Sequence, residues 1–253
     1  MLSKNKIKQI QSLNRKKIRD ESGLFLVEGN KMVEESLRSG FIVETLICTS
    51  EFIQAHPEIR MRAQEIIETD SELIHKASLL QNPQDSLAIV RMPDTTNPTE
   101  NFENELILAL DFIQDPGNLG TILRIADWFG IHNVICSENT VDVYNPKVVQ
   151  ASMGAIFRVK TKYTQLDDFL NRAKDSGIPV YGTFLEGENI YSEKLTRNGI
   201  LILGNEGNGI SESAAKFVTQ KLFIPSFSSE PNQPESLNVA IAAAICCSEF
   251  RRR

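Results

Sequence analysis

The sequence predicts an α/β protein with two domains. Short apolar runs alternate with segments of helical spacing along the chain, which is typical of a sheet whose strands are joined by helices. Residues 92–104 are polar, contain two prolines and show no periodicity, so they read as a linker. With 253 residues, the chain is long enough for two cores. We therefore expect a smaller N-terminal domain over residues 1–95 and a larger domain over residues 105–253.

The first half of the chain alternates helices and strands. Apolar residues at helical spacing predict a helix over residues 4–18, which Gly23 ends. The spacing also predicts a helix over residues 30–38, closed by Gly40. Strands are expected at residues 24–27, 43–48, 66–67 and 86–91, and further helices at residues 52–63 and 71–77. These elements form a small α/β sandwich.

The second half predicts a larger α/β sheet of six strands. Asp115 to Asn118 form a turn that opens a helix reaching residue 129, and Pro146 begins a short helix over residues 145–152. Strands are expected at residues 105–112, 131–136, 156–159, 179–184, 200–203 and 221–224. Two more helices are expected at residues 166–174 and at the apolar residues 239–247.

Two of these strands end in loops of unusual composition. The glycines of residues 204–209 are spaced G-x-x-G-x-G, which is neither the dinucleotide fingerprint nor a phosphate-binding Walker loop. Such small residues let the backbone approach a ligand closely. Ligands of open α/β sheets bind at the carboxyl ends of strands, so residues 204–209 and 225–238 are the expected pocket walls. A plain turn at the first loop, and a simple helix cap at Ser236, are the alternatives.

Charge is distributed unevenly along the chain. The net charge is −6, yet residues 1–19 hold seven lysines and arginines and no acid. Residues 1–19, here termed the basic arm, therefore precede a chain that is acidic overall. This distribution is expected if the N-terminus binds the phosphates of a nucleic acid, and the alternative is a basic helix face exposed to solvent. No apolar run reaches membrane-spanning length and the N-terminus lacks a signal-peptide core. We therefore expect a cytoplasmic protein.

The cysteines and histidines argue against a metal centre. Cys48, Cys136, Cys246 and Cys247 show no C-x-x-C spacing, which predicts free and mostly buried thiols. The three histidines are scattered, so neither a metal cluster nor a Ser/His/Asp triad is expected.

Three motifs resemble those of a known family, in the family's own order. They are Asp115-Pro116-Gly117-Asn118-Leu119-Gly120 followed by Arg124, then residues 203–211 (LGNEGNGIS), then Ile224-Pro225 with Ser236-Leu237-Asn238-Val239. This pattern is similar to the SpoU/TrmH family of S-adenosylmethionine-dependent RNA 2′-O-ribose methyltransferases, which have the SPOUT trefoil-knot fold. Residues 22–29 resemble the family's appended L30e-like RNA-binding domain. The resemblance implies an RNA substrate, ribosomal RNA rather than transfer RNA, and a homodimer.

The resemblance also implies roles for single residues. The positions that match the catalytic set are Asn118, Arg124, Glu206, Ser236 and Asn238, and those that match the S-adenosylmethionine site are Thr183, Gly204, Ile224 and Leu237. Since an arginine in a protein is effectively always charged, we expect Arg124 to clamp a phosphate and the developing alkoxide. A surface helix arginine is the alternative for Arg124, and cap or turn roles are the alternatives for the neutral residues.

Two positions depart from the family pattern. The loop at residues 225–236 is longer than usual and lacks the customary glycine. Gln150 stands where an arginine is common, which predicts the loss of a phosphate contact there. Three other functions stay open at this point: a transfer-RNA 2′-O-methyltransferase, a non-catalytic RNA-binding protein that keeps the fold, and a nicotinamide-dependent oxidoreductase. The sequence lacks the glycine fingerprint that a nicotinamide-dependent oxidoreductase needs.

Overall fold

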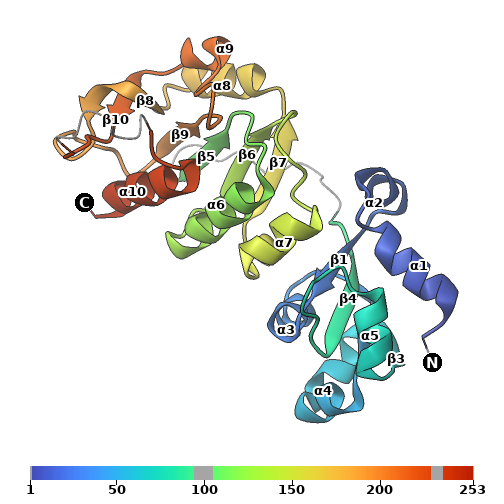
Figure 1. Ribbon diagram of the computed structural model, residues 1–253. Helices are drawn as coiled ribbons and strands as arrows, with labels where there is room; N and C mark the ends of the chain where they lie inside the picture. Colours follow the sequence, from blue (N-terminus) through green and yellow to red (C-terminus); the bar gives the residue numbers. More distant parts are fainter. Residues whose placement is uncertain (1, 94–104, 229–235, 253) are drawn as a thin grey trace. The chain divides into compact units, whose positions relative to one another are not determined.

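The structure, a computed structural model, describes residues 2–93, 105–228 and 236–252 (Figure 1). The chain divides into two compact units by its contacts. The first unit comprises Met1–Thr95 and Asp142–Arg158, and the second comprises Thr96–Val141 and Val159–Arg253. The predicted linker at residues 92–104 and the long loop at residues 225–236 lie mostly outside the described residues.

The first unit is built on a four-stranded sheet of order β1-β4-β2-β3. The strands are β1 (Leu24–Glu28), β2 (Val43–Cys48), β3 (Ala63–Glu68) and β4 (Ser86–Arg91). Strand β4 is antiparallel to both β1 and β2, and β3 runs parallel to β2 at the edge. The helices of this unit are α1 (Lys4–Ser12), α2 (Lys16–Ser22), α3 (Asn30–Arg38), α4 (Ser50–Ala55), η1 (Pro57–Met61), α5 (Ser71–Ala77), α7 (Pro146–Ser152) and η2 (Ala155–Phe157).

Alternation along the strands of this unit places apolar side chains on both faces of the sheet. On one face Leu24 and Leu26 pack in a core with Ile10 of α1 and Ile74 of α5. On the other face Phe25 contacts the rings of Phe41 and Tyr144. The sheet is therefore covered on both sides by parts of the same unit.

A buried ion pair ties residues 142–158 into the first unit. Arg19 is 1% exposed, and its Nε donates to Asp142 Oδ2 at 3.1 Å. The Arg19 guanidinium also donates to the carbonyls of Leu13 and Asn14 at 2.8 and 2.9 Å. A buried charge is tolerable only when it is paired and its remaining donors are satisfied, and here both conditions hold. Arg19 is therefore a structural residue, and it is not part of a phosphate-binding arm as the charge pattern predicted.

The second unit contains a parallel sheet of order β10-β8-β9-β5-β6-β7. The strands are β5 (Leu106–Leu110), β6 (Asn133–Ser137), β7 (Lys160–Thr164), β8 (Val180–Asn189), β9 (Gly199–Leu203) and β10 (Gln220–Phe223). Every residue of β5 and β9 is buried, as expected for central strands of a sheet covered on both faces. After β5 the chain continues to β6 and β7 on one side of the sheet, and after β9 it continues to β10 at the opposite edge. The topological switch of the sheet therefore lies between these two strands.

Helices α6 (Pro116–Trp128) and α10 (Val239–Arg251) lie side by side and parallel in this unit (Figure 1). Their N-termini are joined by Asn238, whose side chain donates to that of Asn118 at 2.9 Å. Their C-termini are joined by Arg251, which donates to the carbonyl of Phe129 at 2.8 Å. The unit also contains α8 (Leu166–Asp175) and α9 (Glu212–Ala215). In the part of the chain that is described, no helix has the length and apolar character needed to cross a membrane.

The predicted α/β architecture is confirmed, together with the N-terminal α/β domain, but several elements differ from the prediction. The helix predicted over residues 4–18 is two helices, because the chain breaks after Ser12 and turns the carbonyls of Leu13 and Asn14 toward Arg19. The strand predicted at residues 156–159 is wrong. Gly154, with a φ of 91°, leads into a 3₁₀ turn there, and the strand begins at Lys160.

Helix α3 spans Asn30–Arg38 as predicted, but extended Ser39 caps it, so Gly40 does not close it. Two other helices have ends that differ from the prediction. Pro57 interrupts the helix predicted over residues 52–63 and starts a 3₁₀ turn. Helix α10 continues to Arg251, beyond the predicted end at residue 247.

The four cysteines are free and buried, as predicted. Burial raises the pKa of the thiols of Cys136 and Cys246, and it raises the pKa of Cys247 to about 12. These thiols are packing groups and are not reactive nucleophiles.

Candidate functional site

Three of the predicted residues meet at the topological switch of the second unit. Asn118, in the first turn of α6 after β5, donates through Nδ2 to Oε1 of Glu206 in the loop after β9. Asn238 donates through Nδ2 to Oδ1 of Asn118 at 2.9 Å. The chain of hydrogen bonds from Asn238 through Asn118 to Glu206, here termed the amide relay, therefore joins three segments that are far apart in the sequence.

Helix capping explains how the two asparagines reach this position. The side chain of Asp115 caps α6 by accepting from the N–H of Asn118 at 2.8 Å, and Pro116 occupies the first turn. Asn238 caps α10, since its Oδ1 accepts from the N–H groups of Ala240 and Ile241. The positive end of the α6 dipole thus lies beside the carboxylate of Glu206, which is a favourable arrangement for a negative charge.

Arg124 lies on α6 and takes no part in the amide relay. Its side chain is exposed and makes no hydrogen bond or ion pair with any residue that the structure describes. It lies six positions after Asn118, which is about 9 Å along the helix axis. Its positive charge is not neutralised by any side chain that the structure describes.

Gly204 begins the loop of residues 204–209, here termed the glycine loop, and only glycine fits there. A Cβ at Gly204 would come within 2.2 Å of the carbonyl carbon of Gly209 and 2.3 Å of the nitrogen of Ile210. This closeness arises because Asn205 and Gly209 exchange two backbone hydrogen bonds of 2.9 Å each. Gly204 is thus buried against the loop's own backbone, and the part of the loop that is exposed at the carboxyl end of β9 is residues 206–209.

The other predicted residues lie around these loops without joining the amide relay. Thr183, at the point where β8 leaves its neighbour β9, donates to the carbonyl of Ile202 at 3.3 Å. Ile224 directly follows β10 and is half-buried, and Leu237 is 50% exposed. Ser236 is exposed beside Leu237.

The sequence interpretation missed three residues that hold these loops together: Asp111, Phe112 and Asn205. The side chain of Asn205 donates to the carbonyl of Phe112 at 2.9 Å, and Asp111 is a buried carboxylate that accepts from the N–H of Ser211 at 2.7 Å. An acidic residue directly after a wholly apolar strand is the one signal that marks Asp111 in the sequence.

The chain matches two family models. Residues 105–248 match the SpoU rRNA Methylase family, and residues 4–88 match the MRM3-like substrate binding domain. The chain belongs to the SpoU family. The family match includes residues 142–158, although their contacts place them in the first unit.

Similar proteins align with this SpoU chain over nearly its whole length. It is 32% identical to the Bacillus subtilis protein named 23S rRNA (guanosine(2553)-2′-O)-methyltransferase RlmP, covering 97% of this chain and 96% of that protein. A putative RNA methyltransferase of the TrmH family from Porphyromonas gingivalis has a similar structure, with a TM-score of 0.90, 41% identity, and coverage of 100% of this chain and 99% of that one. An AdoMet-bound rRNA methyltransferase from Sinorhizobium meliloti aligns with a TM-score of 0.85, 29% identity, and coverage of 100% and 97%.

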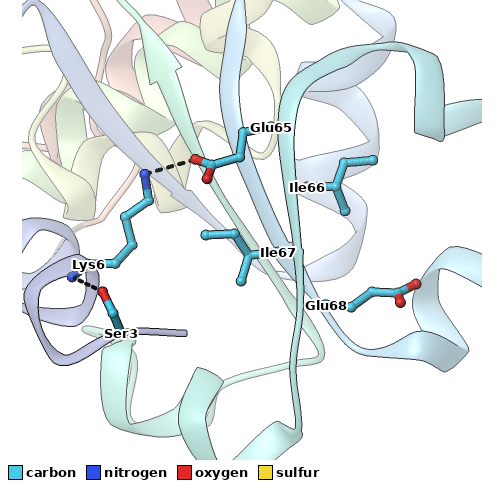
Figure 2. A pocket seen from close by; sticks show the side chains of 6 residues that line it. All are labelled: Ser3, Lys6, Glu65, Ile66, Ile67 and Glu68. Carbon is cyan, nitrogen blue, oxygen red and sulfur yellow. Dashed lines mark hydrogen bonds and ion pairs between the residues drawn. The ribbon is translucent and has the colours of Figure 1, made fainter. Parts of the chain in front are cut away.

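A groove of about 520 Å³ lies elsewhere, in the first unit of this SpoU protein, between the start of α1 and the edge strand β3. It is lined by Ser3, Lys6, Glu65, Ile66, Ile67 and Glu68. Figure 2 shows Lys6 reaching across to Glu65, at 3.1 Å. Thr45 also receives a hydrogen bond from Lys6 and donates one to Glu65. These three polar groups satisfy one another, so the groove offers no argument for a ligand.

Metal-ligating side chains do not gather in the described ranges. Among those residues, no group of three or more histidine, cysteine, aspartate and glutamate side chains is placed to hold an ion.

Proposed function

We propose that this SpoU protein transfers a methyl group from S-adenosylmethionine to a ribose 2′-hydroxyl of ribosomal RNA. The observation that carries the proposal is the amide relay at the topological switch, formed by the glycine loop and the first turns of α6 and α10, with Arg124 on the same helix as Asn118. The B. subtilis relative is named as a 23S rRNA 2′-O-methyltransferase, and the S. meliloti relative is described as AdoMet-bound, which supports both the reaction and the cofactor.

The glycine loop fits the proposed cofactor. Gly204 is packed against Gly209 and Ile210 with no space for a side chain, and this packing fixes a loop whose exposed residues 206–209 have main-chain groups that could hold an adenosine. Gly204, Ile224 and Leu237 would bind it through backbone groups, with Thr183 at the end of the neighbouring strand. When bound, S-adenosylmethionine supplies an electrophilic methyl group on a positively charged sulfur.

The acceptor side requires that a ribose 2′-oxygen attack the methyl carbon in line with the carbon–sulfur bond, which breaks to leave a neutral thioether, and that the hydroxyl proton pass to solvent water. A permanently charged arginine is a poor base but a strong partner for phosphate and for an oxygen that gains negative charge. We assign Arg124 this clamping role. Asn118, Ser236 and Asn238 orient the ribose, and Glu206 is held beside them by Asn118.

The N-terminal unit contributes the RNA contact in this proposal. Its match to a substrate-binding domain supports this assignment. Lys16 and Lys17 of the basic arm pair with Asp20 and Glu21, and Lys6 pairs with Glu65. Lys4, Lys8 and Arg15 are exposed and make no ion pair within the described part of the chain. We propose that these three residues meet RNA phosphates.

The same reasoning extends to assembly and topology. Trp128 at the end of α6 and Ile241 in the first turn of α10 are 84% and 53% exposed, and these two separate apolar side chains on adjacent helices support the proposed homodimer. Helix α10 packs on α6, the helix that follows the central strand β5, although β10, the strand before α10, is at the edge of the sheet. This return of the chain toward α6 supports the proposed trefoil knot.

We also propose a division by function into residues 1–95, which bind RNA, and residues 105–253, which carry the methyltransferase site. The second range contains the whole SpoU match. A cytoplasmic location is proposed as well, and the four free thiols support it.

The test is to incubate the purified protein with radiolabelled S-adenosylmethionine and ribosomal RNA from a strain that lacks the gene, and to map the product. Methyl groups on a ribose 2′-oxygen at a defined site are expected. Methylation of a base, or faster transfer to transfer RNA than to ribosomal RNA, would contradict the proposal. Binding of RNA without transfer would favour the non-catalytic alternative.

A further inference from the structure

The two loops at the topological switch are tied together by residues outside the predicted catalytic and cofactor sets. One loop follows β5 at Asp111 and Phe112, and the other runs from Gly204 to Ser211 after β9. Since β5 and β9 are neighbours and parallel, both loops begin at the same edge of the sheet. The ties between them decide where the glycine loop lies.

The first tie is the side chain of Asn205. Its Nδ2 donates to the carbonyl of Phe112 at 2.9 Å. Its Oδ1 accepts from the N–H groups of Gly207 and Asn208, at 2.9 and 3.0 Å. One side chain therefore folds the glycine loop on itself and anchors it to the neighbouring loop.

The second tie is Asp111, which is only 6% exposed. Its carboxylate accepts from the N–H of Ser211 at 2.7 Å, at the far end of the loop after β9. Its own N–H donates to the carbonyl of Leu203 at 2.9 Å, at the near end. The segment between Leu203 and Ser211 is thus held at both ends by the residues that follow β5.

Phe112 adopts an unfavourable backbone conformation to complete this arrangement. Its φ is 62°, in the left-handed region that residues with a bulky side chain rarely occupy. The conformation persists because both of its backbone polar groups are held. Its N–H donates to Ser137 Oγ at 2.8 Å, and its carbonyl accepts from Asn205. Backbone strain of this kind is concentrated at functional sites, where the surrounding structure over-determines it.

We infer that Asn205 and Asp111 are positioning residues that hold the glycine loop in the conformation that binds the methyl donor. Gly204 directly precedes Asn205, and Glu206 directly follows it, so a rotation at Asn205 displaces the cofactor backbone and the amide relay together. The inference rests on the proposed methyltransferase function.

The decisive variant is Asn205→Asp, which keeps the acceptor for Gly207 and Asn208 but removes the donor to Phe112. In calorimetric titration of the full chain with S-adenosylmethionine, the dissociation constant should rise roughly ten- to a hundred-fold. Affinity for a ribosomal RNA fragment should stay at the wild-type value, because the RNA contacts of the N-terminal unit are untouched. Asp111→Ala should weaken cofactor binding similarly, while Asp111→Asn, which keeps an acceptor for Ser211, should restore it.

Asn133→Asp is the matched control. Its side chain donates to Glu105 at 2.6 Å at the opposite, amino-terminal edge of the same sheet, so the same chemical change there should lower the melting temperature without changing cofactor affinity. Wild-type affinity in Asn205→Asp and Asp111→Ala would overturn the inference. So would a loss of cofactor affinity that Asn133→Asp reproduces. A wild-type protein that fails to bind S-adenosylmethionine would instead contradict the proposed function itself.

Discussion

In the first unit the buried arginine is paired with a carboxylate, whereas in the second the arginine on α6 has no partner among the residues that are described. Arg19 is enclosed by Asp142 and two carbonyls. Arg124 is exposed, and Glu206, in the loop after β9, is held by the neutral amide of Asn118. Charge in the first unit therefore joins segments of the chain, whereas the charge of Arg124 in the second unit joins no segments that the structure describes.

The two units also differ in whether their hydrogen-bonded carboxylates are buried or exposed. In the first unit Glu28 is buried, and it accepts from the hydroxyl of Ser78 and the N–H of Leu79 at 2.8 and 3.0 Å. At the switch of the second unit, amides and backbone groups fix the loops, and the one carboxylate held by the amide relay stays exposed. Substitutions should consequently change stability in the first unit and ligand binding in the second.

The largest effect on stability is expected from Arg19→Ala. It leaves the partly buried Asp142 without its partner, and breaking a buried pair in this way typically costs about 3–5 kcal/mol of the free energy of unfolding. Chemical denaturation of the full chain would measure the loss. An apolar pair at the same positions, Arg19→Met with Asp142→Leu, should recover most of it. A single variant as stable as the wild type would show that the pair does not hold residues 142–158 in place.

Gly204→Ala should act mainly on the ligand. The new Cβ collides with the backbone of Gly209 and Ile210, so the loop must open, at a cost of about 1–3 kcal/mol in stability. Binding of S-adenosylmethionine should fall below detection by calorimetry. The control is Gly207→Ala in the same loop, where the nearest atom is Asn205 Oδ1 at 3.5 Å. If Gly204→Ala binds S-adenosylmethionine as tightly as Gly207→Ala does, the close packing at Gly204 is not needed for cofactor binding.

Glu28 should give the first unit a pH-dependent stability. Burial raises the pKa of this carboxyl above its unfolded value of 4.5. The folded state therefore binds the proton more tightly, and stability falls as the pH rises from below 4.5 through the raised pKa, after which it is constant. Glu28→Gln keeps an acceptor for Ser78 and should remove this pH dependence. The change in the free energy of unfolding that it removes is about 1 kcal/mol for each unit by which the folded and unfolded pKa values differ. If Glu28→Gln shows the same pH dependence of stability as the wild type in thermal melts from about pH 4 to 8, another group causes that dependence.

The smallest effect is expected at the exposed pair of Lys6 and Glu65. These side chains are 21% and 54% exposed, and such pairs contribute about 0–1 kcal/mol. Lys6 lowers the pKa of Glu65, so the small contribution should disappear as the pH falls through that lowered value. Lys6→Met should shift the denaturation midpoint only slightly. A loss comparable to that of Arg19→Ala would erase the distinction between buried and exposed pairs.

Much of the fold could be predicted from the sequence because the signals are local. The apolar runs of β5 and β9, the caps at Asp115 and Asn238, and the close-packed glycine at position 204 are each encoded within a few residues. Strand β7 was misplaced because its residues, KTKYT, are polar and half-exposed, so no apolar run marks it. The tie between Arg19 and Asp142 spans 123 positions, and no local pattern predicts such a pair.

The candidate site shows the same limit. Asn118, Glu206 and Asn238 could be named from motifs, and the structure brings them together. Asn205 and Asp111 could not, because their importance depends on which strands are neighbours in the sheet. Strand order is a property of the whole chain and is not visible in any one segment.

The most direct test of the account compares Arg124→Ala with the wild type in two measurements: calorimetric affinity for S-adenosylmethionine, and the rate of methyl transfer to ribosomal RNA. The account predicts that cofactor affinity stays within about twofold of the wild-type value, while the rate falls by about a hundredfold or more, because the lost cation acts on the acceptor. Equal losses of affinity and rate would make Arg124 structural. An unchanged rate would contradict the proposal that this unpaired charge serves the reaction.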